Sequence, residues 1–155
     1  MGVIGGLARG LAAGFAGTAA LDASTRAQRA IVDADGPIDY DDSLVVVRLA
    51  QRWTPLDLDA RGEIVVNQLM RFGYGSAAGV LRHLLEGRVR RPAVVLFAVM
   101  WLGEVALLRV AGVAPLPWRW RRDVLATSLA QHAVYVVATE AAYRALRADE
   151  PAART

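Results

Sequence analysis

The chain has no cysteine and no lysine, and only two histidines among its 155 residues. Without cysteine it can form no disulfide, no thiolate nucleophile and no zinc site with cysteine ligands. Its basic side chains are therefore all arginines, a bias that a GC-rich genome explains. Selection for bidentate contacts with anions is the alternative explanation. The net charge of +3 is small, so nucleic acid is not an expected partner.

Apolar residues are abundant. They make up 55% of the chain, and the mean hydropathy is +0.31. Soluble domains have an apolar fraction of about 45–50%. The length fits a single domain covering residues 1–155. Composition therefore predicts one membrane domain rather than a soluble globule.

Glycine recurs at every fourth position near the N-terminus. Gly2, Gly6, Gly10 and Gly14 form this row, and Thr18 continues it with another small residue. Gly75 and Gly79 form a second pair with the same spacing. Glycine costs about 1 kcal/mol per helical site relative to alanine, but rows of small residues let helices in lipid pack closely. We therefore expect these seven residues to be helix-packing sites.

Apolar stretches predict an all-α membrane bundle with four spans, each near the roughly 20 residues that a crossing helix needs. The third stretch is the most apolar. The second is the least, and a buried helix of a soluble protein is its alternative interpretation. The predicted spans cover residues 3–23, 64–85, 93–113 and 124–146.

The longest polar stretch separates the first two spans, at residues 24–63. We expect a loop carrying short helices at the membrane surface. Its aspartates include Asp33 and Asp35, just before Gly36, but this glycine comes too early for a calcium-binding EF-hand loop. A solvated acidic loop is the prediction. The tail, residues 148–155, is expected to be disordered.

Four spans place both termini on one side of the membrane. Arginines occur in the loops on both sides, so the positive-inside rule does not fix the orientation; we favour cytoplasmic termini. After the third span, tryptophans alternate with arginines, which is typical of residues anchored at the membrane surface. The expected interfacial anchors are Trp118, Arg119, Trp120, Arg121 and Arg122.

Four ionisable residues fall inside apolar segments: Glu104, Arg109, His132 and Glu140. A charge at mid-membrane costs about 2.5–3.5 kcal/mol on insertion scales, so such residues must pair or face water. Pairs that fix helix register are the favoured interpretation, and a proton pathway is the alternative. We expect Glu104 to lie nearer Glu140, and His132 nearer Val110. No spacing indicates a metal ligand set.

The second half contains Trp101-Leu-Gly-Glu104, Pro115-Leu-Pro117-Trp118 and His132-Ala-Val-Tyr135, and closes with Ala141-Ala-Tyr143-Arg-Ala-Leu146. This order of elements resembles the YagU-like group of small four-helix bacterial inner-membrane proteins. The first half fits more loosely, through residues 10–18. The resemblance implies a fold and a multi-pass inner-membrane location, and no catalytic activity.

These patterns favour a non-enzymatic membrane protein without a cofactor. The expected role is an accessory subunit of a membrane complex or a homo-oligomer, with membrane lipid and other membrane subunits or a second copy as partners. A small proton, ion or solute transporter using Glu104, His132 and Glu140 is the alternative.

Overall fold

A computed structural model describes residues 3–31, 51, 58–112 and 114–148. Within these ranges the chain is α-helical and contains no strand, so the predicted all-α class is confirmed. The described elements are α1 (Val3–Ile31), α3 (Ala60–Leu85), α4 (Pro92–Val110), the 3₁₀ helix η1 (Pro117–Arg119) and α5 (Arg122–Ala148).

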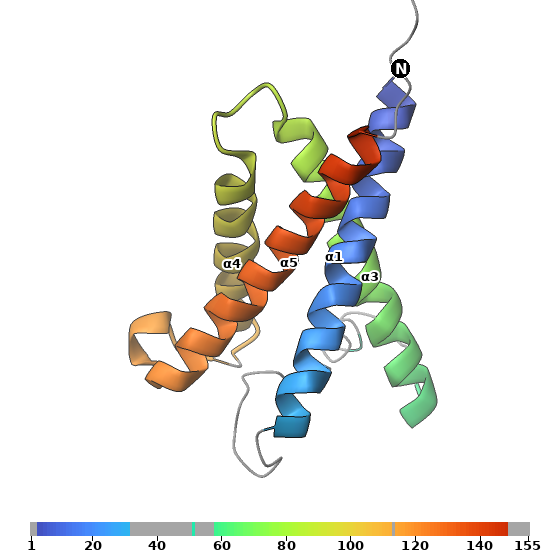
Figure 1. The fold of residues 1–155 in the computed structure, drawn as a ribbon. Helices are drawn as coiled ribbons and strands as arrows, with labels where there is room; N and C mark the ends of the chain where they lie inside the picture. Colours follow the sequence, from blue (N-terminus) through green and yellow to red (C-terminus); the bar gives the residue numbers. More distant parts are fainter. Residues whose placement is uncertain (1–2, 32–50, 52–57, 113, 149–155) are drawn as a thin grey trace, which may run out of the picture.

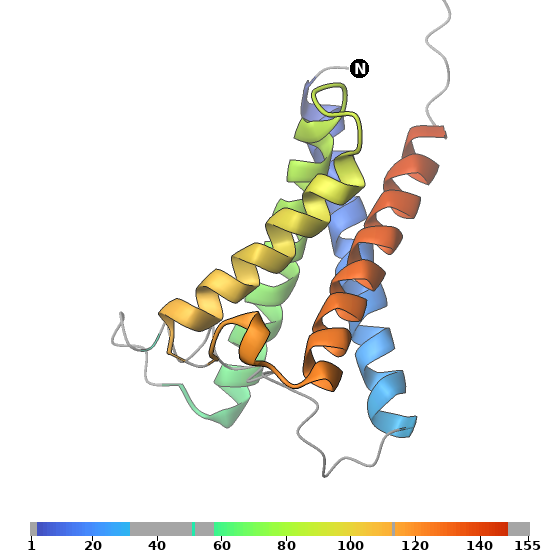
Figure 2. The ribbon, with the colours of Figure 1, turned by 90° about the vertical axis from the view of Figure 1, so that its left-hand side faces the viewer.

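The four α-helices run alternately up and down (Figures 1 and 2). The start of α1 and the end of α5 lie at the same end of the bundle, which we call the terminal end, together with the turn between α3 and α4. The connection between α4 and α5 lies at the opposite end. Helix α1 packs closely against α3 and α5, whereas α4 contacts its neighbours much less.

The helix boundaries correct several predicted ones. Helix α1 continues to Ile31, although a polar loop was expected from residue 24. Its extra turns are supported by local bonds, including the Thr25 hydroxyl donating to the carbonyl of Leu21. Helix α3 begins four residues before the expected start, because Asp59 caps it by accepting from the Gly62 amide at 2.7 Å. Helix α4 ends at Val110, before the left-handed Gly112.

Residues 32–50 and 52–57 of the expected polar loop lie outside the described residues, as do Gly2 and the tail from residue 149. The two core clusters lie where α4 meets its neighbours. One joins Leu96 and Met100 of α4 to Tyr135 and Val136 of α5. The other lies beside the connection between α4 and α5.

Among the described helices, two are long and apolar enough to cross a membrane: α1, over Ile4–Gln28, and α4, over Pro92–Val110. The core helix of a soluble protein would pass the same test but would be mostly buried. Only 22% of the apolar window of α4 is buried, and Val94, Val99 and Leu102 are all exposed. Helix α4 therefore combines the most apolar sequence of the four helices with little protein cover.

Over most of their length, all four helices expose apolar side chains to the outside of the bundle. On α5, between Asp123 and Arg144, each exposed residue is an alanine or a valine, whereas Ser128, His132 and Thr139 point into the bundle. On α3, between Arg61 and Leu85, each exposed residue is again apolar, glycine or tyrosine. We call this surface the apolar band; it comprises the exposed residues 4–23 of α1, 64–84 of α3, 94–107 of α4 and 126–141 of α5.

Candidate functional site

The glycines of α1 and α3 meet inside the molecule. A Cβ atom added at Gly10 would lie 2.8 Å from the carbonyl oxygen of Gly79. One added at Gly79 would lie 2.7 Å from the Cα atom of Gly14. Gly75 borders the same contact, through its carbonyl oxygen beside Gly14. The two helices therefore touch backbone to backbone, which only glycine permits at these positions.

The remaining members of the first row also face neighbours within the chain. Gly6 lies against the ring of His83. Thr18 is buried, donates to the carbonyl of Gly14 at 3.1 Å and lies beside Gly75. Gly17, which the four-residue spacing did not select, faces α5 instead: a Cβ there would lie 3.0 Å from Tyr135. Helix α1 thus uses its small residues to approach two helices at once.

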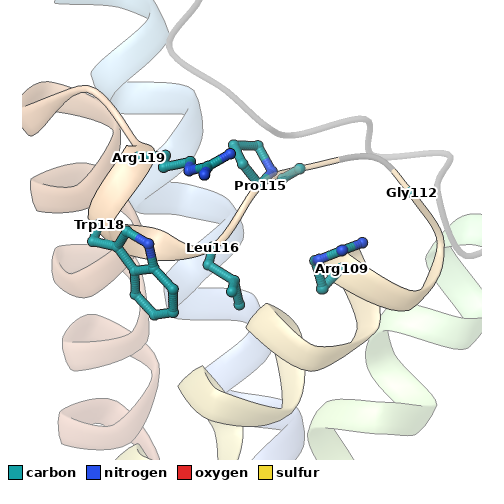
Figure 3. A pocket seen from close by; sticks show the side chains of 7 residues that line it. Arg109, Gly112, Pro115, Leu116, Trp118 and Arg119 are labelled. Atoms are coloured by element: carbon teal, nitrogen blue, oxygen red, sulfur yellow. The ribbon is translucent and has the colours of Figure 1, made fainter.

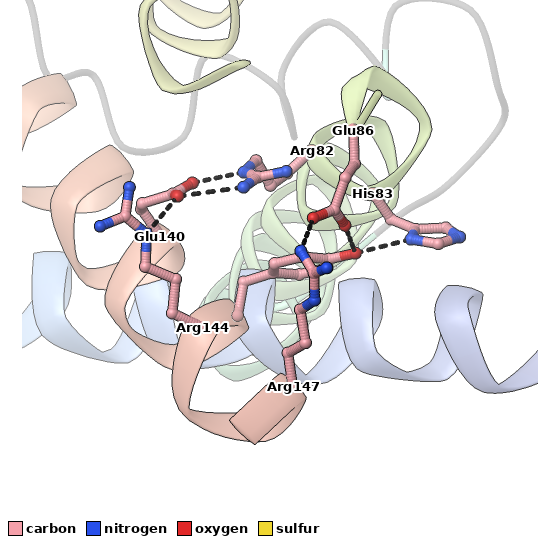
Figure 4. Close-up of polar contacts among 7 residues, drawn as sticks. Arg82, His83, Glu86, Glu140, Arg144 and Arg147 are labelled. Carbon is pink, nitrogen blue, oxygen red and sulfur yellow. Dashed lines mark hydrogen bonds and ion pairs between the residues drawn. The ribbon is translucent and has the colours of Figure 1, made fainter. Parts of the chain in front are cut away.

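Near the terminal end, a buried ion pair joins α3 to α5 (Figure 4). The Arg82 guanidinium donates through both Nε and Nη2 to the two carboxylate oxygens of Glu140. Arg144, one turn further along α5, donates to the same carboxylate at 2.7 Å. Arg82 is only 5% exposed because Glu140 holds it inside the bundle.

Tyr143 links a second group of polar side chains to the first. Its hydroxyl donates to Glu86 at 2.5 Å and contacts Nδ1 of His83 at 2.7 Å, while Arg147 also pairs with Glu86. The phenol has one proton to give, so Nδ1 of His83 is the donor in the second contact. The Arg82 guanidinium lies 4.5 Å from the centre of the Tyr143 ring, in cation–π geometry. We call these seven side chains the terminal polar cluster: Arg82, His83, Glu86, Glu140, Tyr143, Arg144 and Arg147.

A smaller polar group joins α4 to α5 further along the bundle. Oε2 of Glu104 lies 3.6 Å from Nε2 of His132 and accepts from the hydroxyl of Ser128 at 3.3 Å. Trp101 Nε1 donates to the same hydroxyl at 3.2 Å. The Ser128 carbonyl lies 2.9 Å from Nδ1 of His132 and can only accept, so Nδ1 carries a hydrogen. Nε2 is therefore the nitrogen that can exchange a proton beside Glu104.

The structure separates the four ionisable residues that the sequence placed in apolar segments. Glu104 and His132 lie together, Glu140 belongs to the terminal polar cluster, and Arg109 is exposed at the end of α4. The expectation that Glu104 lies nearer Glu140, and His132 nearer Val110, is therefore wrong, because Glu104 and His132 face each other. Because α4 and α5 run antiparallel from a short connection, Glu104, six residues before the end of α4, meets Ser128, six residues after the start of α5.

The interfacial residues after α4 divide into two groups. Trp118 is 75% exposed, and Arg119, Arg121 and Arg122 are exposed as well. Trp120 was expected in the same group, but its ring is 8% exposed and its Nε1 donates to the carbonyl of Pro115 at 2.6 Å. This correction follows from η1, which turns Trp118 outward and Trp120 into the core beside α4.

Arg121 forms an exposed pair with Asp123 next to the first turn of α5. The two side chains make two hydrogen bonds, at 3.1 and 2.5 Å, and Asp123 also accepts from the Val124 amide. The bond from Arg121 is the main reason that the pKa of Asp123 is lowered from 3.8. This pair therefore lies at the first turn of α5.

A hollow of about 430 Å³ lies beside the connection between α4 and α5 (Figure 3). Arg109 from the last turn of α4 lines it, with Leu116, Trp118 and Arg119 from the connecting segment. No carboxylate is among its lining residues. Among the residues that the structure describes, no group of three or more His, Asp or Glu side chains is placed to hold a metal ion.

Sequence reasoning missed several residues that make interhelical bonds, among them Arg82, Ser128, Tyr135 and Tyr143. A signal for three of them is present on α5. Ser128, His132, Tyr135, Thr139 and Tyr143 recur every three or four residues and therefore lie on one helical face. That face points into the bundle.

The chain matches no family model, no curated protein and no solved structure. The resemblance to the YagU-like group therefore stays a prediction. The function is argued below from the contacts of this chain alone.

Proposed function

We propose that all four helices cross a membrane and that the chain is a non-enzymatic, multi-pass inner-membrane protein, an accessory subunit of a membrane complex. The apolar band carries this proposal. A soluble bundle turns its polar residues outward, whereas α3 and α5 keep theirs inside and expose alanine, valine and leucine. Their average hydropathy is low because the polar residues lie on the inner face, not because the outer face meets water.

The dimensions of the band support the same proposal. On α1 it covers residues 4–23, which is about 30 Å at 1.5 Å per residue and equals the hydrocarbon thickness of a bilayer. Exposed arginines flank it at both ends. Arg88, Arg90, Arg91, Arg144 and Arg147 lie at the terminal end, and Arg26, Arg61, Arg109, Arg119, Arg121 and Arg122 at the other. Arginines in these positions reach lipid headgroups.

An accessory role is supported by the fact that the small and polar residues make their contacts within the chain. The described glycines of the two rows pack α1 against α3, so they are not available for a partner. The terminal polar cluster pairs its charges internally, which favours a role in fixing helix register. Helix α4 contacts the bundle least and exposes the most apolar sequence. We therefore assign to α4 the contact with a transmembrane helix of a partner subunit.

Two measurements test this proposal in turn. Membranes washed with carbonate should retain the protein, and detergent should be needed to release it. Single cysteines introduced at Val99 or Leu107 of α4 should then cross-link to a neighbouring protein in native membranes, because the chain has no other cysteine. Ala130→Cys and Val137→Cys on α5 are the matched controls and should not cross-link. A monodisperse protein in buffer without detergent would refute the membrane proposal, and equal cross-linking from both helices would refute the assignment to α4.

Proton transfer is the second candidate function, favoured by one observation. Glu104 and His132 form a close pair that can share a proton, and the Glu104 side chain is 42% exposed within the apolar band. Purified protein in liposomes should show no proton flux above protein-free vesicles if the pair is structural. Flux that Glu104→Gln and His132→Ala both abolish, and that Ala130→Val leaves intact, would make transport the better proposal.

A further inference from the structure

The hollow beside the connection between α4 and α5 has the chemistry of an anion site (Figure 3). Arg109 reaches it from the last turn of α4, and Arg119 reaches it from η1. Among the described residues neither guanidinium forms an ion pair, in contrast to Arg121, which Asp123 holds. With no carboxylate in the lining, two cations face one space. A guanidinium binds phosphate oxygens through two parallel hydrogen bonds.

The wall of the hollow is held in place before any ligand arrives. Trp120 packs into the core and its Nε1 fixes the carbonyl of Pro115 at 2.6 Å. The Ala114 amide bonds back to Leu108 at 3.3 Å, and the Arg119 amide bonds to Leu116 at 2.9 Å. A binding site of this kind loses little conformational entropy when it is filled.

The hollow continues onto an apolar surface. Trp118 and Leu116 line it, and Val110, which is 84% exposed, lies at the end of α4 beside it. Among the exposed residues of α4, Arg109 alone is charged, and it lies in the last turn of the helix. In the proposed membrane arrangement this is the depth of the lipid headgroups, with acyl chains alongside the apolar band.

We infer that this hollow binds the headgroup of an anionic phospholipid, with its phosphodiester between Arg109 and Arg119 and an acyl chain along Trp118 and α4. The inference rests on the proposed membrane location. Free inorganic phosphate offers the same oxygens but no acyl chain, so it would use the arginines without the apolar surface. A zwitterionic lipid adds a cation that the two guanidiniums would repel.

The test uses the purified full-length protein in neutral detergent and native mass spectrometry. The probes are dioctanoyl-phosphatidylglycerol, dioctanoyl-phosphatidylcholine and inorganic phosphate. We expect phosphatidylglycerol to bind several-fold more tightly than phosphatidylcholine. Arg109→Gln and Arg119→Gln should each weaken its binding about tenfold, the factor that the loss of one charge-assisted hydrogen bond implies. Arg88→Gln and Arg90→Gln remove the same charge at the terminal end and should change it less than twofold.

Other outcomes would overturn the inference. Equal binding of the two lipids would refute selection for an anionic headgroup. Phosphate that binds as tightly as the lipid would assign the site to a free anion. Equal losses in the four arginine variants would show that only overall charge matters. Any of these results, in a protein that still needs detergent for release, would leave the proposed membrane location standing.

Discussion

The hydroxyl of Tyr135 on α5 donates a hydrogen bond of 2.6 Å to the carbonyl oxygen of Gly75 on α3. This carbonyl belongs to the glycine that also touches Thr18 of α1. Three helices therefore converge on one glycine. The absence of a side chain there lets α1 approach, and the Tyr135 hydroxyl bonds to the carbonyl of the same residue.

Tyr135→Phe should destabilise the protein by about 1 kcal/mol, because it leaves the ring in place and removes one buried hydrogen bond. Thermal unfolding in detergent, followed by circular dichroism, measures the change. Tyr74→Phe is the control, since Tyr74 is 56% exposed, and it should leave the midpoint where it is. Equal midpoints for the two variants would show that the bond to Gly75 contributes nothing.

Gly79→Ala should destabilise the bundle by about 1–3 kcal/mol, the usual cost of overpacking, because the new methyl group would meet the backbone of Gly14. Gly73 on the same helix has nothing within 4 Å of an added Cβ. Gly73→Ala gives the same increase in helix propensity as Gly79→Ala, about 1 kcal/mol in water, but its methyl group meets no neighbouring atom. Unfolding midpoints of the two variants should therefore shift in opposite directions; a common shift would contradict the close contact.

Arg82→Ala should lower the free energy of unfolding by about 3 kcal/mol, the low end of the range for breaking a buried ion pair. The low end applies because Arg144 still pairs with Glu140. Replacing both partners, as Arg82→Met with Glu140→Leu, should recover most of that loss. Arg147→Ala breaks the more exposed pair with Glu86 and should cost about 1 kcal/mol or less. A double variant as unstable as Arg82→Ala would mean that the charges themselves are needed for folding.

The stability contribution of Asp123 should depend on pH. Its pKa is lowered in the folded protein by Arg121, so its stabilising effect is present above the unfolded value and is lost as the pH falls through the lowered one. Asp123→Asn should therefore unfold at a lower temperature than the parent protein at pH 7. The difference should disappear at a pH below the lowered pKa. A difference that persists there would show that the hydrogen bonds, rather than the charge, stabilise the start of α5.

Much of the architecture was predictable because four long apolar stretches predict four helices. The order of the helices and the place of both termini at one end follow from four apolar stretches. The approach of Gly10 and Gly14 to another helix follows from their spacing. Gly75 and Gly79 of α3 were also predicted packing sites, although their contact with the first row was not deduced. Gly17 was not predicted as a packing residue because a four-residue spacing selects one face of a helix. Helix α1 packs two faces against two helices.

The polar contacts were harder to predict because they depend on register between helices. Glu104 was expected near Glu140, but the short connection after α4 sets it opposite Ser128 and His132. Arg82 lies in the last turn of α3, and only Glu140 on another helix explains its burial. Trp120 differs from Trp118 through one turn of 3₁₀ helix. Such contacts join residues far apart in the sequence, so the spacing of polar residues on α5 indicates an inward face but does not identify their partners.

The central claim is that the outward faces of α3 and α5, whose average hydropathy is low, lie in lipid. Spin labels on single cysteines at Leu69 and Val137, with the protein in phosphatidylglycerol-containing bilayers, test it most directly. Relaxation of these labels by oxygen should be strong and relaxation by a water-soluble nickel chelate weak, as at Val99 of α4. Labels at Arg90 and Arg121 should show the reverse. Strong relaxation by the nickel chelate at Leu69 and Val137 would place α3 and α5 in water and contradict the four-span bundle.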